Sequence, residues 1–416
     1  MNKKLASLLV ISTVWAVYIN AQSKPMLMPP YLQAVTKNSI YVLVESATMD
    51  TVTVEYGTTT AYGSSARTES IETTTNSTYV HNVKLTGLKP NTQYHYRALQ
   101  SGTSSADASF HSAALPGSSF RFAWMADFRT GTAVHDSVAK RVLDAEPVMS
   151  LYGGDLCIRS SYSAFKEEFF RPNQVALIAK VPFFNAPGNH EGWSTNTKAF
   201  TQAPESGSGT QEYYSLDYGD LHVLVVNTEV DYSEGSPQYV FAEKDLAATT
   251  AIWKIAIDHK PAYGAGAHGE NSTFKTMVTK IFEPNRVDMV ISGHSHFYQK
   301  NFVNGIYHVI IGSAGAPLAT PSSERYTLKS VKDYNYAIVD VSPESFRMVV
   351  YDDRGAILDS LILNKSPEVK KSKPGAPEGL RWEQGYPRPF ITPLRIYMRE
   401  GQTLSLFNNS ERSGLR

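Results

Sequence analysis

The first part of the chain alternates apolar and polar residues with the two-residue period of β-strands. This pattern runs through the segments NSIYVLVES, TVTVEYG, YVHNVKLTGL and TQYHYRALQS, which Gly, Asn, Pro, Ser and Thr residues separate. Several short strands at this spacing are typical of two packed antiparallel sheets. Residues 27–115 are therefore predicted to form an antiparallel β-sandwich.

The pattern changes after AALPGSS (113–119), where we place the domain boundary. Short apolar runs now alternate with stretches of helical character at 133–146 and 162–180. Further along, YAIVDVS and SFRMVVYDD return to strand alternation and should complete a sheet. Strands mixed with helices in this way predict a second, α/β layered domain over residues 118–363.

The first residues, MNKKLASLLVISTVWAVYINAQS, combine two lysines, an apolar stretch and a small residue before the expected cleavage point. This arrangement indicates a signal peptide over residues 1–21. The alternative, a membrane anchor, would have an apolar part short of the about 18 residues that span a bilayer. We therefore expect export to the periplasm, cell surface or medium, without stable membrane insertion.

The last residues differ in composition from both domains. A Pro- and Lys-rich stretch, 364–379, has the composition of a linker. The segment that follows, 380–416, carries Glu383-Gln384, Tyr386-Pro387, Pro389-Phe390 and LSLFN. It resembles the C-terminal sorting domains of type IX secretion substrates, although Arg388 replaces the usual Asn and the end is shortened. The resemblance implies the secretion machinery as a partner.

Charge and cysteine content narrow the function classes. Lys plus Arg and Asp plus Glu both number 39, which argues against a nucleic-acid partner but leaves small anionic substrates open. The single cysteine, Cys157, rules out an internal disulfide. We predict that Cys157 is a small buried apolar residue.

Five apolar runs of the second domain end in side chains that can bind a metal ion. In layered α/β folds, the carboxyl ends of strands meet where ligands bind. Oxygen and nitrogen donors gathered there suit two cations, which can hold a phosphoryl group and generate hydroxide between them. The candidate donors are Asp127, Asp155, Asn189, His259, His294 and His296.

The order of these donors resembles the metallophosphoesterase superfamily, most closely the purple acid phosphatases with an N-terminal fibronectin-like domain. The segments GNHE (188–191), DHKPAYGAGAHGE (258–270) and GHSHFYQK (293–300) carry the resemblance. It covers about residues 27–363 and implies an αββα sandwich for the second domain. In the first domain, LTGLKPNTQYHYRAL (85–99) resembles the tyrosine corner of fibronectin type III domains, with Tyr94 closing the turn.

The resemblance also implies roles for individual residues of this chain. Asp155 would bridge two metal ions, of which Fe, Zn and Mn are the candidates. One ion would also bind Asn189, His259 and His294, and the other Asp127 and His296. His190 would contact the phosphate or protonate the leaving oxygen, and His268 would support it. The alternative for His268 is an ordinary loop residue.

Two positions depart from the family's pattern. Arg129 and Ile158 stand where ligands are common in the family, and neither side chain can bind a metal. Without a tyrosine at 158, the protein is expected to lack the family's tyrosinate–iron colour. Tyr162 is the alternative tyrosine ligand, whereas Tyr152 is expected in the core. We expect Arg129 to bind substrate phosphate; the alternatives are that it turns to solvent or pairs with an acid such as Glu191 or Asp136.

These observations predict an exported binuclear phosphatase acting on small phosphomonoesters. Hydroxide held by the metal ions would attack phosphorus while His190 assists the leaving oxygen. Two alternatives remain: a phosphodiesterase or nucleotidase using the same site, and a non-catalytic surface protein whose metal site has degraded. Substrate choice is expected to lie in loops 192–211 and 231–237.

Overall fold

The computed structural model describes residues 25–266, 268–365, 396–397 and 403–404. The predicted signal peptide lies outside them, as do nearly all of the predicted linker and sorting segment. The chain divides into two units, residues 1–370 and 371–416. In the second, β23 (Ile396–Tyr397) pairs antiparallel with β24 (Thr403–Leu404). The first unit contains all the other described elements.

The N-terminal region forms two packed antiparallel sheets, which confirms the predicted β-sandwich. One sheet has the order β1-β2-β6-β5, and the other has β4-β3-β7-β8 with β9 also beside β7. The hydroxyl of Tyr94 accepts a 2.9 Å hydrogen bond from the Lys89 N–H, so Tyr94 closes a turn as predicted. The strands are β1 (Tyr31–Gln33), β2 (Ser39–Ser46), β3 (Thr53–Gly57), β4 (Ser64–Arg67), β5 (Ser70–Thr73), β6 (Tyr79–Thr86), β7 (Gln93–Gln100), β8 (Thr103–Ser104) and β9 (Ala108–His111).

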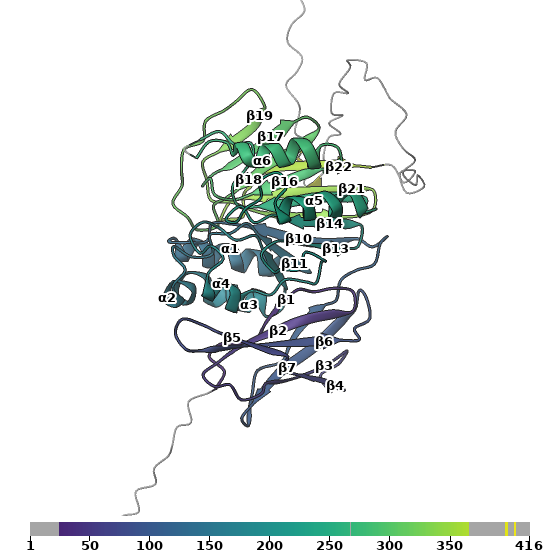
Figure 1. The fold of residues 1–416 in the computed structure, drawn as a ribbon, viewed down its shortest axis with the longest axis vertical. Helices are drawn as coiled ribbons and strands as arrows, with labels where there is room; N and C mark the ends of the chain where they lie inside the picture. The colour runs from purple at the N-terminus through teal and green to yellow at the C-terminus, as the bar shows by residue number, and fades with distance from the viewer. Residues whose placement is uncertain (1–24, 267, 366–395, 398–402, 405–416) are drawn as a thin grey trace, which may run out of the picture. The chain divides into compact units, whose positions relative to one another are not determined.

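The second region contains two further sets of strands with helices on their outer sides (Figure 1). Its strands are β10 (Phe120–Met125), β11 (Met149–Tyr152), β12 (Phe183–Asn185), β13 (Tyr214–Tyr218), β14 (Leu221–Val225), β15 (Trp253–Asp258), β16 (Met289–Ser292), β17 (Tyr298–Val303), β18 (Ile306–Ile311), β19 (Thr327–Val331), β20 (Tyr336–Val341), β21 (Ser345–Tyr351) and β22 (Ile357–Asn364). Its helices are α1 (Thr132–Asp144), α2 (Tyr162–Ala164), η1 (Phe165–Phe169), α3 (Pro172–Ile178), α4 (Thr195–Phe200), α5 (Pro237–Ala248), α6 (Ser272–Met277) and η2 (Val278–Phe282). The stretch predicted as helical over 162–180 is interrupted before Pro172, which begins a new helix because proline lacks the N–H of a helix interior.

Alternate side chains of the strands face different layers. In β10, Phe122 and Trp124 pack between the two sheets, whereas Ala123 and Met125 pack against the side covered by α1 and α3. In the other sheet, Ala256 of β15 packs against α5, α6 and η2. The layers are therefore helix, sheet, sheet and helix, which confirms the predicted αββα sandwich.

The sandwich and the α/β region share one sheet, a feature that strand periodicity alone does not predict. The order β22-β21-β20-β10-β11-β12 continues through β1 into β2-β6-β5. The junction is a parallel pairing in which Gln33 of β1 faces Phe183 of β12. The Gln33 side chain adds a 2.8 Å hydrogen bond to the carbonyl of Phe200. As a result, β1 covers what would otherwise be an open edge of β12.

The strands that lead to the candidate donors run parallel within their sheets. Strands β10, β11 and β12 are parallel neighbours, and so are β14, β15, β16 and β18. Parallel neighbours present their carboxyl ends at one edge, and the candidate donors follow those ends. Among the described residues, no helix is both long enough and apolar enough to cross a bilayer.

Candidate metal centre

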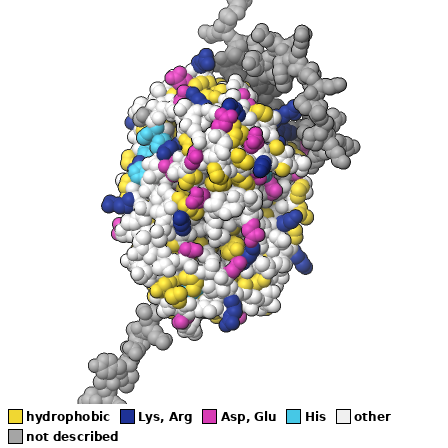
Figure 2. Space-filling view, in the orientation of Figure 1, with side chains coloured by type: hydrophobic (Ala, Val, Ile, Leu, Met, Phe, Trp, Pro, Cys, Tyr) yellow, Lys and Arg dark blue, Asp and Glu magenta, His cyan; other side chains and the backbone are white. Residues whose placement is uncertain are grey.

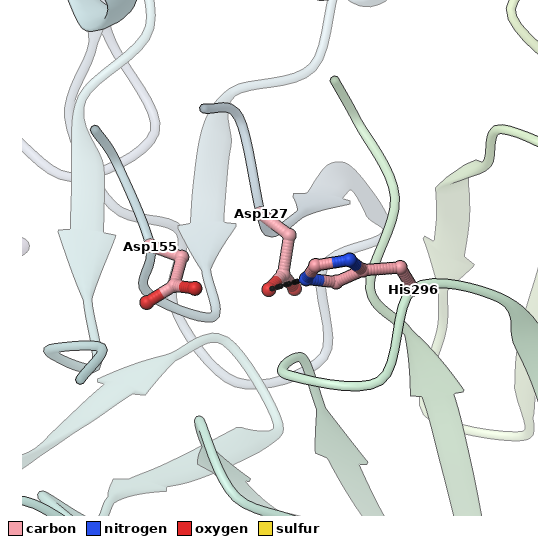
Figure 3. A group of neighbouring side chains, drawn as sticks. All are labelled: Asp127, Asp155 and His296. Atoms are coloured by element: carbon pink, nitrogen blue, oxygen red, sulfur yellow. Dashed lines mark ion pairs between the residues drawn. The ribbon is translucent and has the colours of Figure 1, made fainter. Parts of the chain in front are cut away.

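Asp127 and Asp155 follow β10 and β11 on two loops that are hydrogen-bonded to each other. The Asp127 N–H donates to the Gly154 carbonyl, and the Phe128 N–H to the Asp155 carbonyl, both at 2.9 Å. Both aspartates adopt positive φ, 58° and 53°, a strained backbone conformation for residues other than glycine that is frequent at functional sites. Their side chains are buried and close together (Figure 3). Two residues that lie far apart in the sequence thus reach one point.

Glycines let two further motifs approach these carboxylates. A Cβ atom at Gly188, in GNHE, would lie 2.4 Å from Asp155 Oδ1. A Cβ at Gly293, in GHSH, would lie 2.6 Å from Asp127 Oδ2. Only glycine permits this approach without displacing the carboxylates. The two motifs therefore bring their amide and imidazole donors to the aspartates because their first residue has no side chain.

Three donor atoms from other residues surround the Nε2 atom of His259. Its Nδ1 lies 2.7 Å from the Gly153 carbonyl, which assigns the proton to Nδ1 and leaves Nε2 free to bind a cation. From Nε2 the distances are 3.0 Å to Asn189 Oδ1, and 3.2 Å both to Asp155 Oδ1 and to His294 Nδ1. Atoms bound tetrahedrally to one zinc ion lie about 3.3–3.4 Å apart, so these distances fit a metal site. We call Asp155, Asn189, His259 and His294 the Asn189 group.

A second set of donors, Asp127, Asp155 and His296, forms the Asp127 group (Figure 3). One ligand atom from each lies within 4.8 Å of the others. His296 Nδ1 is 2.9 Å from the Pro317 carbonyl, and its Nε2 is 3.5 Å from Asp127 Oδ1. Asp127 Oδ1 is buried and makes no hydrogen bond within the described part of the chain. A buried carboxylate oxygen without a donor is costly, so the group is suited to a cation.

Arg129 points into this site and pairs with an acid there, as one alternative had it, but that acid is Asp155; solvent exposure and pairing with Glu191 or Asp136 are wrong. Its side chain is 14% exposed. Nε lies 3.3 Å from Asp155 Oδ2, and Nη2 lies 3.3 Å from His296 Nε2. Asp136 instead accepts hydrogen bonds from Asn173, and Glu191 accepts them from backbone N–H groups. Arg129 thus contacts two of the three donors of the Asp127 group.

Tyr162 does not reach the site, so the alternative of a tyrosine ligand at this position is wrong. Its hydroxyl donates a 2.7 Å hydrogen bond to Glu45 in the sandwich, where a buried carboxylate requires donors. Tyr152 is fully buried in the core, as predicted, and accepts a hydrogen bond from Gln174. Cys157 is also buried, as predicted.

His190 and His268 lie beside the donor groups. His190 Nδ1 is 2.8 Å from the Ile158 carbonyl, which directs Nε2 to within 3.7 Å of Asp155 Oδ2. The ring of His268, an exposed residue, lies 4.2 Å from that of His294 between centroids. Figure 2 shows histidine side chains gathered in one place on the left flank of the molecule. Asn189 and His268 are exposed, so the site is open to a small solute.

Two glutamates hold the loops, a role that the sequence did not predict for either. Glu191, 2% exposed, accepts the N–H of Gly188 at 2.8 Å and that of Leu156 at 3.2 Å. Glu168 Oε2 accepts the N–H of Thr130 at 3.1 Å and that of Ile158 at 2.9 Å. The GNHE motif contains Glu191 and offers a signal for it. Glu168 lies in no motif, and only the folded chain shows its role.

Burial and neighbouring charges determine the protonation states of the donors. Burial, reinforced by His259, lowers the pKa of His294 to about 2, so that ring is neutral and able to bind a metal. Burial opposes ionisation of Asp155, but His259, His190 and Arg129 together outweigh it and hold the pKa below its usual value. Burial, together with the Asp155 charge, raises the pKa of Glu191 to about 8. An ionised carboxylate beside the neutral imidazole of His294 provides donors that metal ions favour.

Comparison with known proteins gives matches for both regions. Residues 121–298 match the calcineurin-like phosphoesterase family, and residues 31–112 match the purple acid phosphatase N-terminal domain. Purple acid phosphatase 23 of Arabidopsis thaliana is 26% identical over 57% of this chain and 60% of its own length. Probable inactive purple acid phosphatase 1 of the same plant is 24% identical over 69% of this chain and 58% of its own. The chain thus spans about 60% of the length of these relatives.

A solved structure agrees with these matches at the level of the fold. The purple acid phosphatase PPD1 from seeds of yellow lupin (Lupinus luteus) superposes with a TM-score of 0.71. The superposition covers 83% of this chain and 75% of that one, at 20% identity. At that identity the likeness shows a shared fold. The roles of individual side chains must come from the geometry of the site itself.

Proposed function

We propose that this chain, which joins a purple acid phosphatase N-terminal domain to a calcineurin-like phosphoesterase domain, is a metal-dependent hydrolase of phosphomonoesters. The observation that carries the proposal is the Asn189 group. The carboxylate of Asp155, the amide of Asn189 and the imidazole of His294 place their donor atoms within 3.2 Å of His259 Nε2. Mixed oxygen and nitrogen donors of this kind suit Zn, Fe or Mn.

A cation bound there supplies Lewis acidity and lowers the pKa of water. The chain's own residues supply orientation and proton transfer. His190 is fixed through Nδ1 by the Ile158 carbonyl, so in its protonated form Nε2 can donate a proton to the leaving oxygen. Arg129 uses Nε and Nη2 on the protein and retains other N–H groups for phosphate oxygens. His268 lies over His294 and supports the same phosphate.

A second candidate function is a non-catalytic binding protein, and Arg129 is the observation that favours it. A guanidinium that contacts Asp155 and His296 stands where the family's second ion is expected. One relative is named a probable inactive purple acid phosphatase. Against this, the Asn189 group keeps its full donor set, and its amide and imidazoles make no hydrogen bond with Arg129 among the described residues. A phosphodiesterase or nucleotidase using the same donors is the remaining alternative.

Export is part of the proposal. It is supported by the charged and apolar pattern of residues 1–21 and by the sorting-like segment 380–416. The secretion machinery would be the partner of that segment. Mass determination of the protein recovered from the medium and from cell fractions tests both points, since cleavage after Ala21 would give a defined mature mass.

The activity test uses the full chain, freed of metal by a chelator and then supplied with Zn²⁺, Mn²⁺ or Fe²⁺. We expect hydrolysis of an aryl phosphomonoester that exceeds hydrolysis of the matching diester and disappears on chelation. Asn189→Ala should abolish turnover without unfolding the chain. The control is Asn76→Ala, an exposed turn residue, which should leave turnover unchanged. A wild-type chain that binds metal but hydrolyses neither ester would favour the non-catalytic candidate.

A further inference from the structure

The guanidinium of Arg129 lies between two donors that would otherwise bind a metal ion. Nε meets Asp155 Oδ2 and Nη2 meets His296 Nε2, both at 3.3 Å. His296 Nδ1 is turned to the Pro317 carbonyl, so Nε2 is the nitrogen of that ring available to a cation. Arg129 therefore uses the same lone pairs that a metal ion in the Asp127 group would need.

The backbone around Arg129 is held in place on both sides. The N–H of Thr130, the next residue, donates to Glu168 Oε2, which also receives the N–H of Ile158. Gly131 N–H donates to the Gly315 carbonyl at 3.1 Å. With 14% of its side chain exposed, Arg129 is largely enclosed by these loops. Its position in the Asp127 group is thus built into the loops around it and is not that of a mobile surface side chain.

Charge and chemistry oppose a metal ion next to this side chain. A guanidinium stays protonated and offers only donors, so it repels a neighbouring cation and cannot bind one. The position three residues after Asp155 is Ile158, which also has no lone pair to offer. Tyr162 is directed to Glu45. The Asp127 group is therefore short of donors, and two of its three members already contact a cation.

In the Asn189 group, only the shared residue Asp155 contacts Arg129. Asp155 turns a different oxygen, Oδ1, toward His259 and Oδ2 toward Arg129. One carboxylate thereby faces two cationic positions, as a bridging ligand would. Asn189, His259 and His294 make no contact with Arg129 among the hydrogen bonds and ion pairs of the described residues.

We propose that this chain holds one metal ion, in the Asn189 group, and that the Arg129 guanidinium is a built-in second cation in place of the other ion. Its remaining N–H groups face the substrate phosphate, a role that a second ion would have in a binuclear site. This inference deepens the proposed function and uses its metal site, but the ion count does not depend on hydrolysis. It replaces the expectation of two ions per chain.

The experiment counts bound Mn²⁺ on the full chain by equilibrium dialysis and elemental analysis, with electron paramagnetic resonance as a second readout. The wild-type chain should bind one Mn²⁺ with the spectrum of an isolated ion. Arg129→Ala frees Asp155 Oδ2 and His296 Nε2, and should admit a second Mn²⁺ that is spin-coupled to the first. Arg159→Ala removes a nearby exposed arginine and should bind one ion, like the wild type.

Separate outcomes decide the inference and the proposed function. If the wild-type chain binds two ions with similar affinity, the inference is overturned, whether or not the chain has phosphatase activity. This measurement uses the wild-type chain alone and does not depend on the folding of a variant. If folded Arg129→Ala still binds only one metal ion, Arg129 is not what excludes the second ion, and the inference is overturned. Loss of the ion in Asn189→Ala supports its placement, whereas retention there would overturn it. One ion without any ester hydrolysis would leave the inference standing and remove the proposed function.

Discussion

The hydroxyl of Tyr162 donates to Glu45 Oε1 across a distance of 2.7 Å. Glu45 belongs to β2 of the sandwich and is fully buried, and its carboxylate also receives Thr78 at 2.8 Å and Lys166 at 2.7 Å. Tyr162 and Lys166 lie in α2 and η1, which follow the Asp155 loop. A single carboxylate of the N-terminal sandwich therefore fixes the segment that continues from the candidate metal centre.

Glu45→Ala should destabilise the protein because it leaves Lys166 and Tyr162 without their acceptor. We expect a loss of about 2–3 kcal/mol in the free energy of unfolding, the cost of removing a charged acceptor from largely buried donors. Urea unfolding followed by circular dichroism measures it. Glu205→Ala, which removes an exposed partner of Lys84, is the control and should cost clearly less, because solvent screens exposed ion pairs. Equal losses in both variants would contradict the role of Glu45.

The protein should be colourless when loaded with iron. In the family it resembles, the colour comes from charge transfer between a tyrosinate and ferric iron. Here Ile158 has no phenol, and the Tyr162 phenol is bound to Glu45. Visible absorption of the iron-loaded chain tests this. Ile158→Tyr should create a band, and a band in the wild-type chain would show that another tyrosine reaches the metal.

The motifs made much of the site predictable. Asp127, Asp155 and the histidines each follow an apolar run, and parallel strands necessarily bring such positions to one edge. The sequence favours a direction of Arg129 into the site, but its contacts with Asp155 and His296 could not be predicted, because they depend on a loop that Glu168, a residue outside any motif, helps to hold. Tyr162 was misplaced as an alternative ligand for a similar reason: its partner, Glu45, is 117 residues away in the chain.

The same difference applies to the fold: the local sequence indicates strands and helices, whereas contacts between distant residues determine how the strands pair. Alternating apolar positions predict the longer strands of the sandwich, and short apolar runs between helical stretches predict several strands of the second region. Periodicity does not reveal which strand pairs with which. The parallel contact between Gln33 of β1 and Phe183 of β12 joins the two regions into one sheet, and it rests on side-chain contacts such as Gln33 with the Phe200 carbonyl.

His222 should make stability fall at alkaline pH. Burial would lower its pKa, but hydrogen bonds to Asp217 and Asp245, both at 2.8 Å, outweigh burial and raise the pKa to about 9. Because the pKa of His222 is higher in the folded than in the unfolded chain, protonated His222 stabilises the fold. This stabilisation is fully present below about pH 6.5 and is lost as the pH rises through about 9. Because Asp217 is mostly exposed, we expect about 2 kcal/mol, less than the roughly 3 kcal/mol of an unscreened shift.

The measurement is the urea midpoint of the wild-type chain and of His222→Gln between about pH 6 and pH 10. The difference between the two proteins isolates His222 from the lysines and tyrosines that titrate in the same range. It should be large at the acidic end and vanish above about pH 9. A difference that does not change with pH would show that His222 is not charged in the folded chain.

His190 should matter most for esters with poor leaving groups. If its Nε2 protonates the leaving oxygen, His190→Ala should lower kcat for an alkyl phosphate by about 100-fold or more. An aryl phosphate with an acidic phenol needs little protonation and should lose much less. Steady-state kinetics on both esters measures the ratio. His268→Ala, which removes a neighbouring exposed histidine, should lower both rates alike, and equal losses for the two esters in His190→Ala would exclude the acid role.

Glu191→Gln should weaken metal binding although a glutamine side chain has nearly the same size as a glutamate. Glu191 uses one oxygen for the N–H of Gly188 and the other for that of Leu156, so it joins the loop carrying Asn189 to the loop carrying Asp155. Either orientation of a glutamine amide turns its NH₂ toward one of these N–H donors. One hydrogen bond is lost and two donors face each other inside the protein, at a cost of about 1–3 kcal/mol.

That change should shift one loop relative to the other and separate Asp155 from Asn189. Residues that orient metal ligands in this way typically change metal affinity by about 10–100-fold when substituted, and we expect a loss in that range. Competition with a chelator of known affinity measures it, and circular dichroism verifies that the chain stays folded. Glu167→Gln, an exposed neighbour in η1 whose side chain makes no hydrogen bond among the described residues, is the matched control. If Glu191→Gln binds metal as tightly as Glu167→Gln, the two loops are held by their backbone contacts alone.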